Sequence, residues 1–404
     1  MTDYRLAAPV TTWHVLLLSS WRAAMSRLFS VLARPLLAVA LFAALPTAAM
    51  AGEPGDRIDG SPVIEKLDVA TMPPGKTRLW LRVDDNEIGQ GYYVPIIVVK
   101  GAQPGPRFLL TAGIHGDELN GIGVIHQLVE GLDPATMKGT LIAMPGLNAP
   151  GLRNSTRAFT GGHNGSGENL NRLIPRDPHV QGDEGNAAQR YARRLWSRVF
   201  TGNTDFAIDL HTQSRGGAYP AYVFVATPVA KRIAMMLRPD SVYVNAGIDG
   251  AVEDMLNANA IPAVTYELGG AEVFDNAMIA RGLRGVRNVM IDRGMLPGKP
   301  DIRDPEPFLG NVVTNVDSPR GGWAQLRVKL NQYVKKGDVL AVVTDPFGRT
   351  IATLTAPLDA RVAGLGTDPR TQPGDMVVRL LSWDDSLPCK RDGCPSTVTP
   401  IKAR

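Results

Sequence analysis

Cysteine is almost absent from this sequence, and histidine is scarce. The 404 residues include two cysteines and six histidines. Cys389 and Cys394 flank a Lys-Arg-Asp-Gly turn near the C-terminus, in the segment PCKRDGC, and no histidine lies nearby. Two close cysteines around a turn predict a small disulfide loop in an oxidising compartment better than they predict a metal site.

A large excess of charge of one sign is also missing. The formal net charge is +4, and residues 1–51 hold four arginines and one aspartate, so the rest of the chain carries a charge near +1. The basic character therefore gives no reason to expect nucleic-acid binding, and no nucleotide or haem site is indicated. Hydrophobic residues make up 44% and charged residues 20%, as in an ordinary globular protein.

The N-terminal apolar run is too short to cross a bilayer. It extends from Leu36 to Leu45, ten residues, about half of what a membrane span needs. It follows Arg27 and Arg34 and leads to the triplet Ala49-Met50-Ala51, the layout of a bacterial-type secretory signal peptide at 1–51. We therefore expect an exported, periplasmic protein with no stable membrane span after cleavage. Met25 is a more typical start for such a signal.

The spacing of apolar residues predicts an α/β fold. β-rich runs separated by turn residues lie at 78–83, 92–99, 107–113, 206–211 and 263–270. Helical spacing occurs at 117–131, 184–200, 227–238, 249–259 and 273–293. This alternation predicts a mixed, mostly parallel sheet with helices on both faces.

Changes in composition divide the chain. After the signal peptide we expect a large α/β domain at 52–294 and a Pro-rich linker at 295–308. Short runs divided by turns such as KKGD, DPFG and QPGD then predict a small all-β domain at 309–385. Residues 386–404 form a C-terminal tail with the two cysteines.

The segment GIHGDELNG, residues 113–121, follows a predicted strand and places His115 three positions before Glu118. At that spacing both side chains can point to one side, above the C-terminal edge of the sheet. Imidazole and carboxylate are suitable zinc ligands, and a catalytic zinc takes three protein ligands plus water. An isolated H-x-x-E is better explained as a polar helix start, so a third ligand is required.

His211 is the best candidate for that ligand. It ends the apolar strand FAIDLH and therefore lies at the same edge of the sheet. His14 would be removed with the signal peptide, and His126 is expected to pack inside a helix. His163 and His179 lie in a polar stretch and could be solvated.

Glu267 and a long polar stretch supply further candidates. Glu267 ends the strand AVTYE, where a carboxylate either pairs with a cation or serves as general base for a metal-bound water. Taken alone, an ion pair is the better interpretation. The polar stretch 148–182 contains Arg157, Asn171 and Arg172, and segments of that length are usually functional. Arginine can grip a carboxylate or stabilise an oxyanion, although most surface arginines do neither.

Four motifs together resemble those of a known family. The motifs occur in the order GIHGDE, NLNR, DLHT and YELGG. They look like the motifs of the succinylglutamate desuccinylase and aspartoacylase family, a branch of the zinc carboxypeptidase superfamily. The resemblance covers residues 78–293 and implies a zinc carboxypeptidase-like fold. It also implies that His115, Glu118 and His211 hold one zinc ion per chain and that Glu267 activates the bound water.

The same resemblance assigns roles in substrate binding. Arg157 corresponds to the family arginine that polarises the scissile carbonyl, and Asn171 and Arg172 would bind a substrate carboxylate. The usual DLNR motif begins here with Asn169, which removes one carboxylate and keeps the Asn-Arg pair. The β domain is similar to the C-terminal domain of family members, which can cover part of the cleft.

These assignments imply a zinc-dependent amidohydrolase of the N-acyl amino acid deacylase type. A water activated by zinc and deprotonated by Glu267 would attack an amide carbonyl, and Glu267 would hand the proton to the leaving amine. The partner is then a small-molecule or short peptide substrate with a free carboxylate. No oligomeric state is indicated.

Two alternatives remain open. A metallocarboxypeptidase-like peptidase acting on envelope peptides would share every metal residue. A non-catalytic periplasmic protein that binds zinc or a ligand is the second alternative. Glu267 and Arg157 argue against it, because neither is needed merely to hold zinc.

Overall fold

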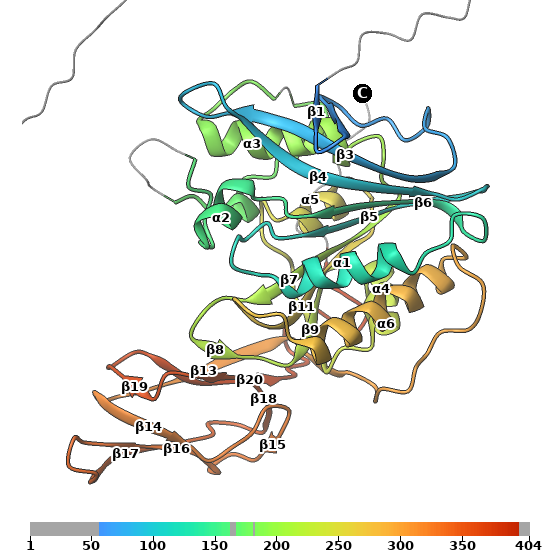
Figure 1. Cartoon of the computed structure of the whole chain (residues 1–404). Helices are drawn as coiled ribbons and strands as arrows, with labels where there is room; N and C mark the ends of the chain where they lie inside the picture. The colour runs from blue at the N-terminus through green and yellow to red at the C-terminus, as the bar shows by residue number, and fades with distance from the viewer. Residues whose placement is uncertain (1–55, 162–166, 181, 396–404) are drawn as a thin grey trace, which may run out of the picture. The chain divides into compact units, whose positions relative to one another are not determined.

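The computed structural model describes residues 56–161, 167–180 and 182–395 (Figure 1). The predicted signal peptide, with the alternative start at Met25, and also His163 lie outside the described residues. Within the described ranges, no helix is both long enough and apolar enough to cross a membrane.

A large mixed β-sheet runs through the main domain. Among the described residues its eleven strands lie in the order β1-β2-β3-β4-β6-β5-β7-β11-β9-β10-β12. They are β1 (Arg57–Ile58), β2 (Ser61–Ile64), β3 (Gly75–Asp85), β4 (Gly91–Lys100), β5 (Gln103–Ala112), β6 (Lys138–Pro145), β7 (Phe206–Gln213), β9 (Ala221–Val225), β10 (Ser241–Val244), β11 (Ala263–Gly270) and β12 (Phe308–Gly310). Neighbours are parallel from β6 through β5 and β7 to β11, and β9 is antiparallel to β11. The predicted mixed, mostly parallel sheet is confirmed.

Helices cover both faces of this sheet (Figure 1). They are α1 (Asn120–Glu130), α2 (Ala149–Asn154), α3 (Ala187–Leu195), α4 (Pro228–Leu237), α5 (Val252–Ala258) and α6 (Asn276–Asp292), with a 3-10 turn at Leu170–Arg172 and a π-helical turn at Trp196–Phe200. Helices α1, α4 and α6 pack onto one apolar core, and α3 and α5 onto a second. Successive strand residues alternate between the cores, as Leu109 and Leu110 of β5 do, because side chains of a strand point to opposite faces.

Several local expectations differ from the structure. Helix α1 begins at Asn120 and not at residue 117, because residues 114–117 form bends and turns after β5. Strands β9 and β10 correspond to no predicted strand, since runs of this length do not separate strand from helix by periodicity. The polar stretch 148–182 contains α2 and the 3-10 turn.

The prediction that His126 packs inside a helix is wrong. His126 belongs to α1 but is exposed. The buried face of α1 includes Ile122, Ile125 and Val129. Consecutive helical residues differ by about 100° around the axis, so the side chain that follows Ile125 points to solvent. His179 is also exposed.

Two further antiparallel sheets form a small all-β domain, as predicted. The first contains β13 (Val312–Asp317), β20 (Met376–Ser382), β18 (Ala360–Gly366) and β15 (Tyr333–Val334), and the second contains β17 (Thr350–Thr355), β16 (Val339–Thr344), β14 (Gly322–Leu326) and β19 (Arg370–Thr371). The two sheets enclose a core of their own. The short strand β8 (Gly217–Ala218), which follows β7, pairs with β18, so the β domain is hydrogen-bonded to a loop of the main domain.

The segments on either side of the β domain contact the main domain. Residues 295–307 contain no helix or strand, and β12 then pairs with β10 of the large sheet. Near the C-terminus, a disulfide joins Cys389 to Cys394. The amide of Cys394 donates to the carbonyl of Ala226 at 3.0 Å, which attaches this loop to the main domain.

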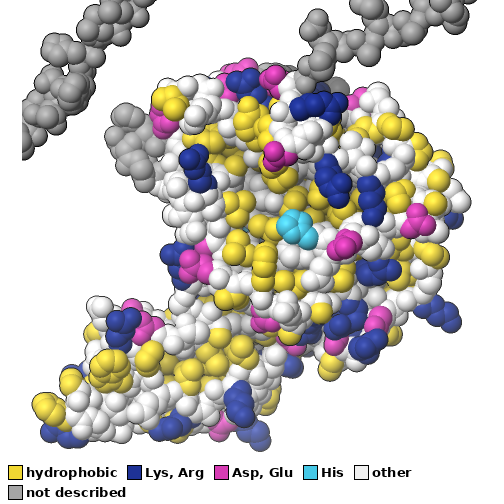
Figure 2. Space-filling model, viewed as in Figure 1, with side chains coloured by type: hydrophobic (Ala, Val, Ile, Leu, Met, Phe, Trp, Pro, Cys, Tyr) yellow, Lys and Arg dark blue, Asp and Glu magenta, His cyan; other side chains and the backbone are white. Residues whose placement is uncertain are grey.

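Charged side chains of both signs are mixed on the surface. In the view of Figure 2, Lys and Arg lie among Asp and Glu, and the described residues form no broad area of one sign. This distribution agrees with the nearly balanced charge of the chain after residue 51.

Candidate functional site

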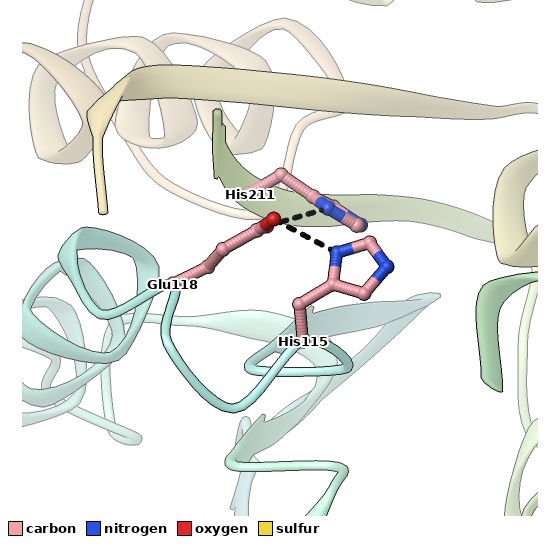
Figure 3. A group of neighbouring side chains, drawn as sticks. All are labelled: His115, Glu118 and His211. Atoms are coloured by element: carbon pink, nitrogen blue, oxygen red, sulfur yellow. Dashed lines mark ion pairs between the residues drawn. The ribbon is translucent and has the colours of Figure 1, made fainter. Parts of the chain in front are cut away.

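Three buried side chains meet at the sheet edge where β5 and β7 end (Figure 3). His115 follows β5, Glu118 lies in the loop before α1, and His211 belongs to β7. Their ligand atoms all lie within 4.8 Å of one another. The structure therefore brings together the three residues that the sequence predicts as metal ligands.

Glu118 lies between the two imidazoles. Its Oε1 is 2.9 Å from His115 Nδ1, and its Oε2 is 2.9 Å from His211 Nδ1. None of the three side chains is more than 3% exposed. Both Nδ1 atoms therefore face one carboxylate in a site that is shielded from solvent.

The outer nitrogen of each imidazole faces an acceptor. His211 Nε2 lies 2.7 Å from Asp209 Oδ2, and His115 Nε2 lies 3.0 Å from Asn169 Oδ1. Since these oxygens only accept, each Nε2 carries the hydrogen. In the neutral ring the Nδ1 lone pair is then free to bind a metal. His115 Nδ1 has no partner of acceptable hydrogen-bond geometry among the described residues, despite its closeness to Glu118.

Sequence reasoning missed Asp209 and Asn169 as parts of this site. Asp209 precedes His211 by two positions in β7, so both side chains lie on the same face of the sheet. Its Oδ1 accepts a hydrogen bond from Thr111 Oγ1 at 2.6 Å. The D-x-H spacing at the end of a strand is the signal that could have found Asp209. Asn169, the first residue of the NLNR motif, supplies an acceptor to His115.

The electrostatics of the group favour a bound positive charge. Burial alone would raise the pKa of the Glu118 carboxyl, but the imidazoles of His211 and His115 hold that pKa far below its ordinary value. Burial lowers the pKa of His115. Burial also opposes the charged form of His211, but the carboxylates of Asp209 and Glu118 hold the pKa of that imidazole well above its ordinary value. A metal cation can replace the proton that these carboxylates attract.

Glu267 lies beside this group. Strands β7 and β11 are parallel neighbours in which His211 and Glu267 are register partners. Glu267 is 5% exposed, and its Oε2 has no hydrogen-bond partner among the described residues. Burial, partly offset by His211, raises the pKa of Glu267 to about 8. A raised carboxyl pKa suits a group that has to accept a proton from water.

Arg157 reaches the group from the solvent side. Its Nη1 donates to Glu118 Oε1 at 2.5 Å and to the hydroxyl of Ser214. Its side chain is 40% exposed, whereas that of Glu118 is 1% exposed. The guanidinium therefore lies between the buried carboxylate and the solvent.

Asn171 and Arg172 lie in the 3-10 turn beside α5. Asn171 is buried, and its Oδ1 accepts the backbone amide of Val252 at 2.9 Å. Its side-chain NH₂ group remains as a donor. Arg172 is exposed and donates from Nη1 to the carbonyl of Asn171 at 2.5 Å.

One cavity of about 240 Å³ connects these residues. It is lined by six of the seven predicted site residues, all except Glu118. Other parts of its wall come from Tyr222 of β9, from Glu253 and Asp254 at the start of α5, and from Arg379 of β20. The cavity is smaller than the roughly 300–1,000 Å³ of pockets for drug-sized ligands. Its size therefore suits a small polar molecule.

Comparison with known proteins finds a matching family and a similar curated protein. Residues 104–292 match the succinylglutamate desuccinylase/aspartoacylase catalytic domain. The chain is similar to the N-alpha-acetyl-L-2,4-diaminobutyric acid deacetylase of Halomonas elongata, with 29% identity over 365 residues that cover 84% of this chain and 100% of the relative.

Solved structures share the fold. A succinylglutamate desuccinylase/aspartoacylase from Rhodobacter sphaeroides superimposes with a TM-score of 0.67 and 22% identity, covering 80% of this chain and 100% of the other. The product-bound ectoine utilization protein EutE (DoeB) from Ruegeria pomeroyi gives a TM-score of 0.64 and 22% identity. The match covers 77% of this chain and 98% of the other. At these identities the likeness establishes the fold.

Proposed function

We propose that this protein is a zinc-dependent hydrolase that cleaves the amide bond of an N-acyl amino acid, because residues 104–292 match the succinylglutamate desuccinylase/aspartoacylase catalytic domain. The observation that carries the proposal is the meeting of His115, Glu118 and His211 beside Glu267 at one cavity. The similarity to a deacetylase supports amide hydrolysis.

The donor set fits zinc. Two imidazole nitrogens and one carboxylate form known catalytic zinc sites, which keep a further position for water or substrate. The buried Nδ1 of His115, which has no acceptable hydrogen-bond partner among the described residues, supports a cation at this place. Zinc held by His115, Glu118 and His211 would supply a Lewis acid and a bound water with a pKa of about 7.

Glu267 would act as general base and then as general acid. Its unpartnered Oε2 would accept the proton of the attacking water and later deliver it to the leaving nitrogen. Burial raises the pKa of Glu267, which helps the carboxyl to hold the proton between these steps. The register pairing with His211 keeps this carboxyl beside the metal ligands.

The arginines would orient the substrate. Arg157 lies next to Glu118 and would direct its guanidinium at the scissile carbonyl, where charge develops. Asn171 and Arg172 line the same cavity and would bind a free carboxylate of the substrate through charge-assisted hydrogen bonds.

A cavity of about 240 Å³ favours an N-acyl amino acid over an envelope peptide. Glu267 and Arg157, both lining it, favour catalysis over ligand binding alone.

We also propose that the protein acts after export to the periplasm. The signal-peptide layout of residues 1–51 and the disulfide between Cys389 and Cys394 support an oxidising compartment.

The test uses residues 52–404 purified with zinc. Bound zinc is measured by mass spectrometry of the metal, and hydrolysis is screened with N-acetyl and N-succinyl amino acids and with short peptides. We expect close to one zinc per chain and hydrolysis of an N-acyl amino acid. Glu267→Gln should lower kcat/KM by about 10²–10⁴-fold with unchanged zinc content.

Glu130→Gln is the matched control, because Glu130 is an exposed residue at the end of α1. It should change neither zinc content nor turnover. Bound zinc without turnover that depends on Glu267 would favour the binding protein. Hydrolysis restricted to peptides would favour the peptidase.

A further inference from the structure

Arg157 lies in a segment that has little regular structure of its own. Residues 155–158 follow α2 and form no helix or strand. The side chain of Arg157 is 40% exposed. An arginine has many rotamers, and holding it in one of them costs conformational entropy. The direction of this guanidinium therefore depends on the side chains that it contacts.

Arg157 contacts one predicted metal ligand and one residue outside the metal group. Its Nη1 donates to Glu118 Oε1 and to the hydroxyl of Ser214. The Glu118 carboxylate is a weaker partner for a guanidinium once it also binds a cation. The contact with Ser214 involves no predicted metal ligand. Ser214 can therefore hold Arg157 whether or not the metal is bound.

The next residue, Arg215, binds the backbone of the same segment. Its Nη2 donates to the carbonyl of Ser155, two positions before Arg157. Ser155 ends α2 with a φ of 49°, so the chain changes direction at this residue. Ser214 therefore holds the guanidinium, and Arg215 holds the backbone that leads to it.

Arg215 also reaches two loops that adjoin the site. Its Nη2 lies 2.8 Å from Glu272 Oε1, in the segment after β11, and its Nε lies 3.5 Å from Asp117 Oδ2, in the loop before α1. The side chains of Arg215 and Glu272 are about half exposed, so this ion pair should add little to the free energy of unfolding. What these contacts provide is geometry, because they connect the segment of Arg157 to the loop that holds Glu118.

The turn that carries Ser214 and Arg215 is fixed at both ends. It follows β7 and precedes β8. Strand β8 pairs with β18 of the β domain, and the amide of Thr367 donates to the carbonyl of Gly216 at 3.1 Å. The turn, residues 214–216, is therefore held between the large sheet and the β domain.

We propose that Ser214 and Arg215 are positioning residues, which direct the guanidinium of Arg157 at the scissile carbonyl of the substrate. A donor that is placed before the reaction stabilises the charge that develops in the transition state without first having to move. The expected effect is therefore on kcat and not on KM. This inference rests on the proposed function, in which Arg157 polarises that carbonyl.

A double-mutant cycle tests whether Ser214 acts through Arg157, with the N-acyl amino acid that the wild type hydrolyses best. Ser214→Ala should lower kcat about tenfold and change KM by less than about twofold, since it removes one hydrogen bond to a charged group. In Arg157→Met the same substitution should change kcat by less than about twofold, because the group that Ser214 holds is gone. An equal loss of kcat in both backgrounds would overturn the proposal. Ser386→Ala is the matched control at an exposed serine and should keep the wild-type kcat.

Hydrogen exchange tests the contact of Arg215 without any substrate. The amide of Thr156 donates to the carbonyl of Gly151 at 3.0 Å, so its exchange reports the opening of this segment. Arg215→Met should speed that exchange about threefold or more in the zinc-loaded protein, because the segment opens more often. Arg153→Met, at an exposed arginine of α2, is the matched control and should leave the exchange unchanged. Unchanged exchange in Arg215→Met would overturn the proposal.

The two experiments separate this inference from the proposed function. Hydrolysis with equal losses of kcat in both backgrounds would retain the hydrolase and overturn the positioning role. Faster exchange in Arg215→Met without hydrolysis of any N-acyl amino acid would retain the contact with the segment of Arg157 and overturn the hydrolase. If Arg157→Met has no measurable turnover, Ser214→Ala decides through its kinetic constants, and a loss through KM alone would overturn the proposal.

Discussion

Glu267 and His211 are register partners in the parallel strands β11 and β7. Both side chains are buried at the same edge of the large sheet. Their relative position is therefore set by backbone hydrogen bonds between neighbouring strands and not by a loop. Sites built on strands hold side chains more accurately than sites built on loops. The third strand of this edge, β5, leads directly into the loop that carries His115 and Glu118.

We predict that Asp209→Asn weakens zinc binding by about 10- to 100-fold, the range measured for partners of metal-binding histidines. The carboxylate of Asp209 accepts from His211 Nε2 at 2.7 Å and from Thr111 Oγ1 at 2.6 Å. An amide is neutral, so it makes the imidazole a less basic ligand. Competition with a coloured chelator measures the affinity.

Asn169→Asp is the complementary variant. It places a carboxylate beside His115 Nε2, where the structure has an amide oxygen at 3.0 Å. Zinc affinity should rise, because the imidazole becomes a stronger donor. Unchanged affinity in both variants would show that these acceptors serve the fold and not the metal.

We predict that Gly116→Ala disturbs the site through the backbone. A Cβ at Gly116 would lie 2.0 Å from the carbonyl carbon of Gly151 and 2.3 Å from the nitrogen of Leu152. Backbone atoms of α2 cannot rotate away, so the loop with His115 and Glu118 must shift. Overpacking of this kind costs about 1–3 kcal/mol or more. Urea denaturation and zinc content measure the two effects.

Gly131→Ala is the control for that variant. Gly131 follows α1, has a negative φ, and a Cβ there would lie 3.6 Å from the nearest atom, Gln127 O. Zinc content should stay unchanged. A similar loss of zinc in both variants would contradict the steric argument.

Much of the site could be predicted because its residues lie where apolar strands end. His211 and Glu267 each stand near the end of a buried run, and the parallel pairing of β7 and β11 makes those ends adjacent. The partners of the metal residues were harder to find. Asn169 reaches His115 only through the folding of the polar stretch 148–182, which no periodic pattern describes.

The burial of Glu253 could not be predicted from the sequence pattern. Its position falls in a predicted helix, and a charged residue there is normally solvated. Its burial depends on the packing of α5 against β7 and β11, which brings together segments distant in the chain. His126 shows the opposite error, since a helical pattern identifies a helix but does not decide each side chain at the edge of the apolar face.

We predict that zinc raises the melting temperature of the protein. A ligand that binds the folded state at about 1,000 times its dissociation constant adds about 4.1 kcal/mol to the free energy of unfolding. Thermal unfolding in excess zinc and in a chelator measures the difference. His115→Gln should abolish this response, because it removes one of the three donors. His126→Gln, at an exposed position of α1, should retain it, and loss of the response there would contradict the assignment.

We predict that the metal-free protein becomes less stable as the pH rises from about 5 to above 8. Burial and Asp254 raise the pKa of Glu253 from 4.5 to about 8. A carboxyl with a higher pKa in the folded state binds its proton more tightly when folded. Its stabilising contribution is therefore complete below pH 4.5 and is lost as the pH rises through about 8.

Glu253→Gln isolates this contribution, because the amide does not titrate. Asp254 and Glu267 also have raised pKa values and act in the same direction, so the variant should still lose stability with pH, but less steeply. Urea denaturation in a chelator at pH 5.5, 7.0 and 8.5 measures the free energy of unfolding. Between pH 5.5 and pH 8.5, the free energy of unfolding of the wild type should fall by at least about 1 kcal/mol more than that of the variant. One unit of pKa shift corresponds to 1.36 kcal/mol. Asp249 is an exposed carboxyl before α5, so the stability of Asp249→Asn should depend on pH in the same way as that of the wild type. The same pH dependence in Glu253→Gln as in the wild type would mean that the charge of the Glu253 carboxylate is compensated in the folded protein, which would contradict the prediction.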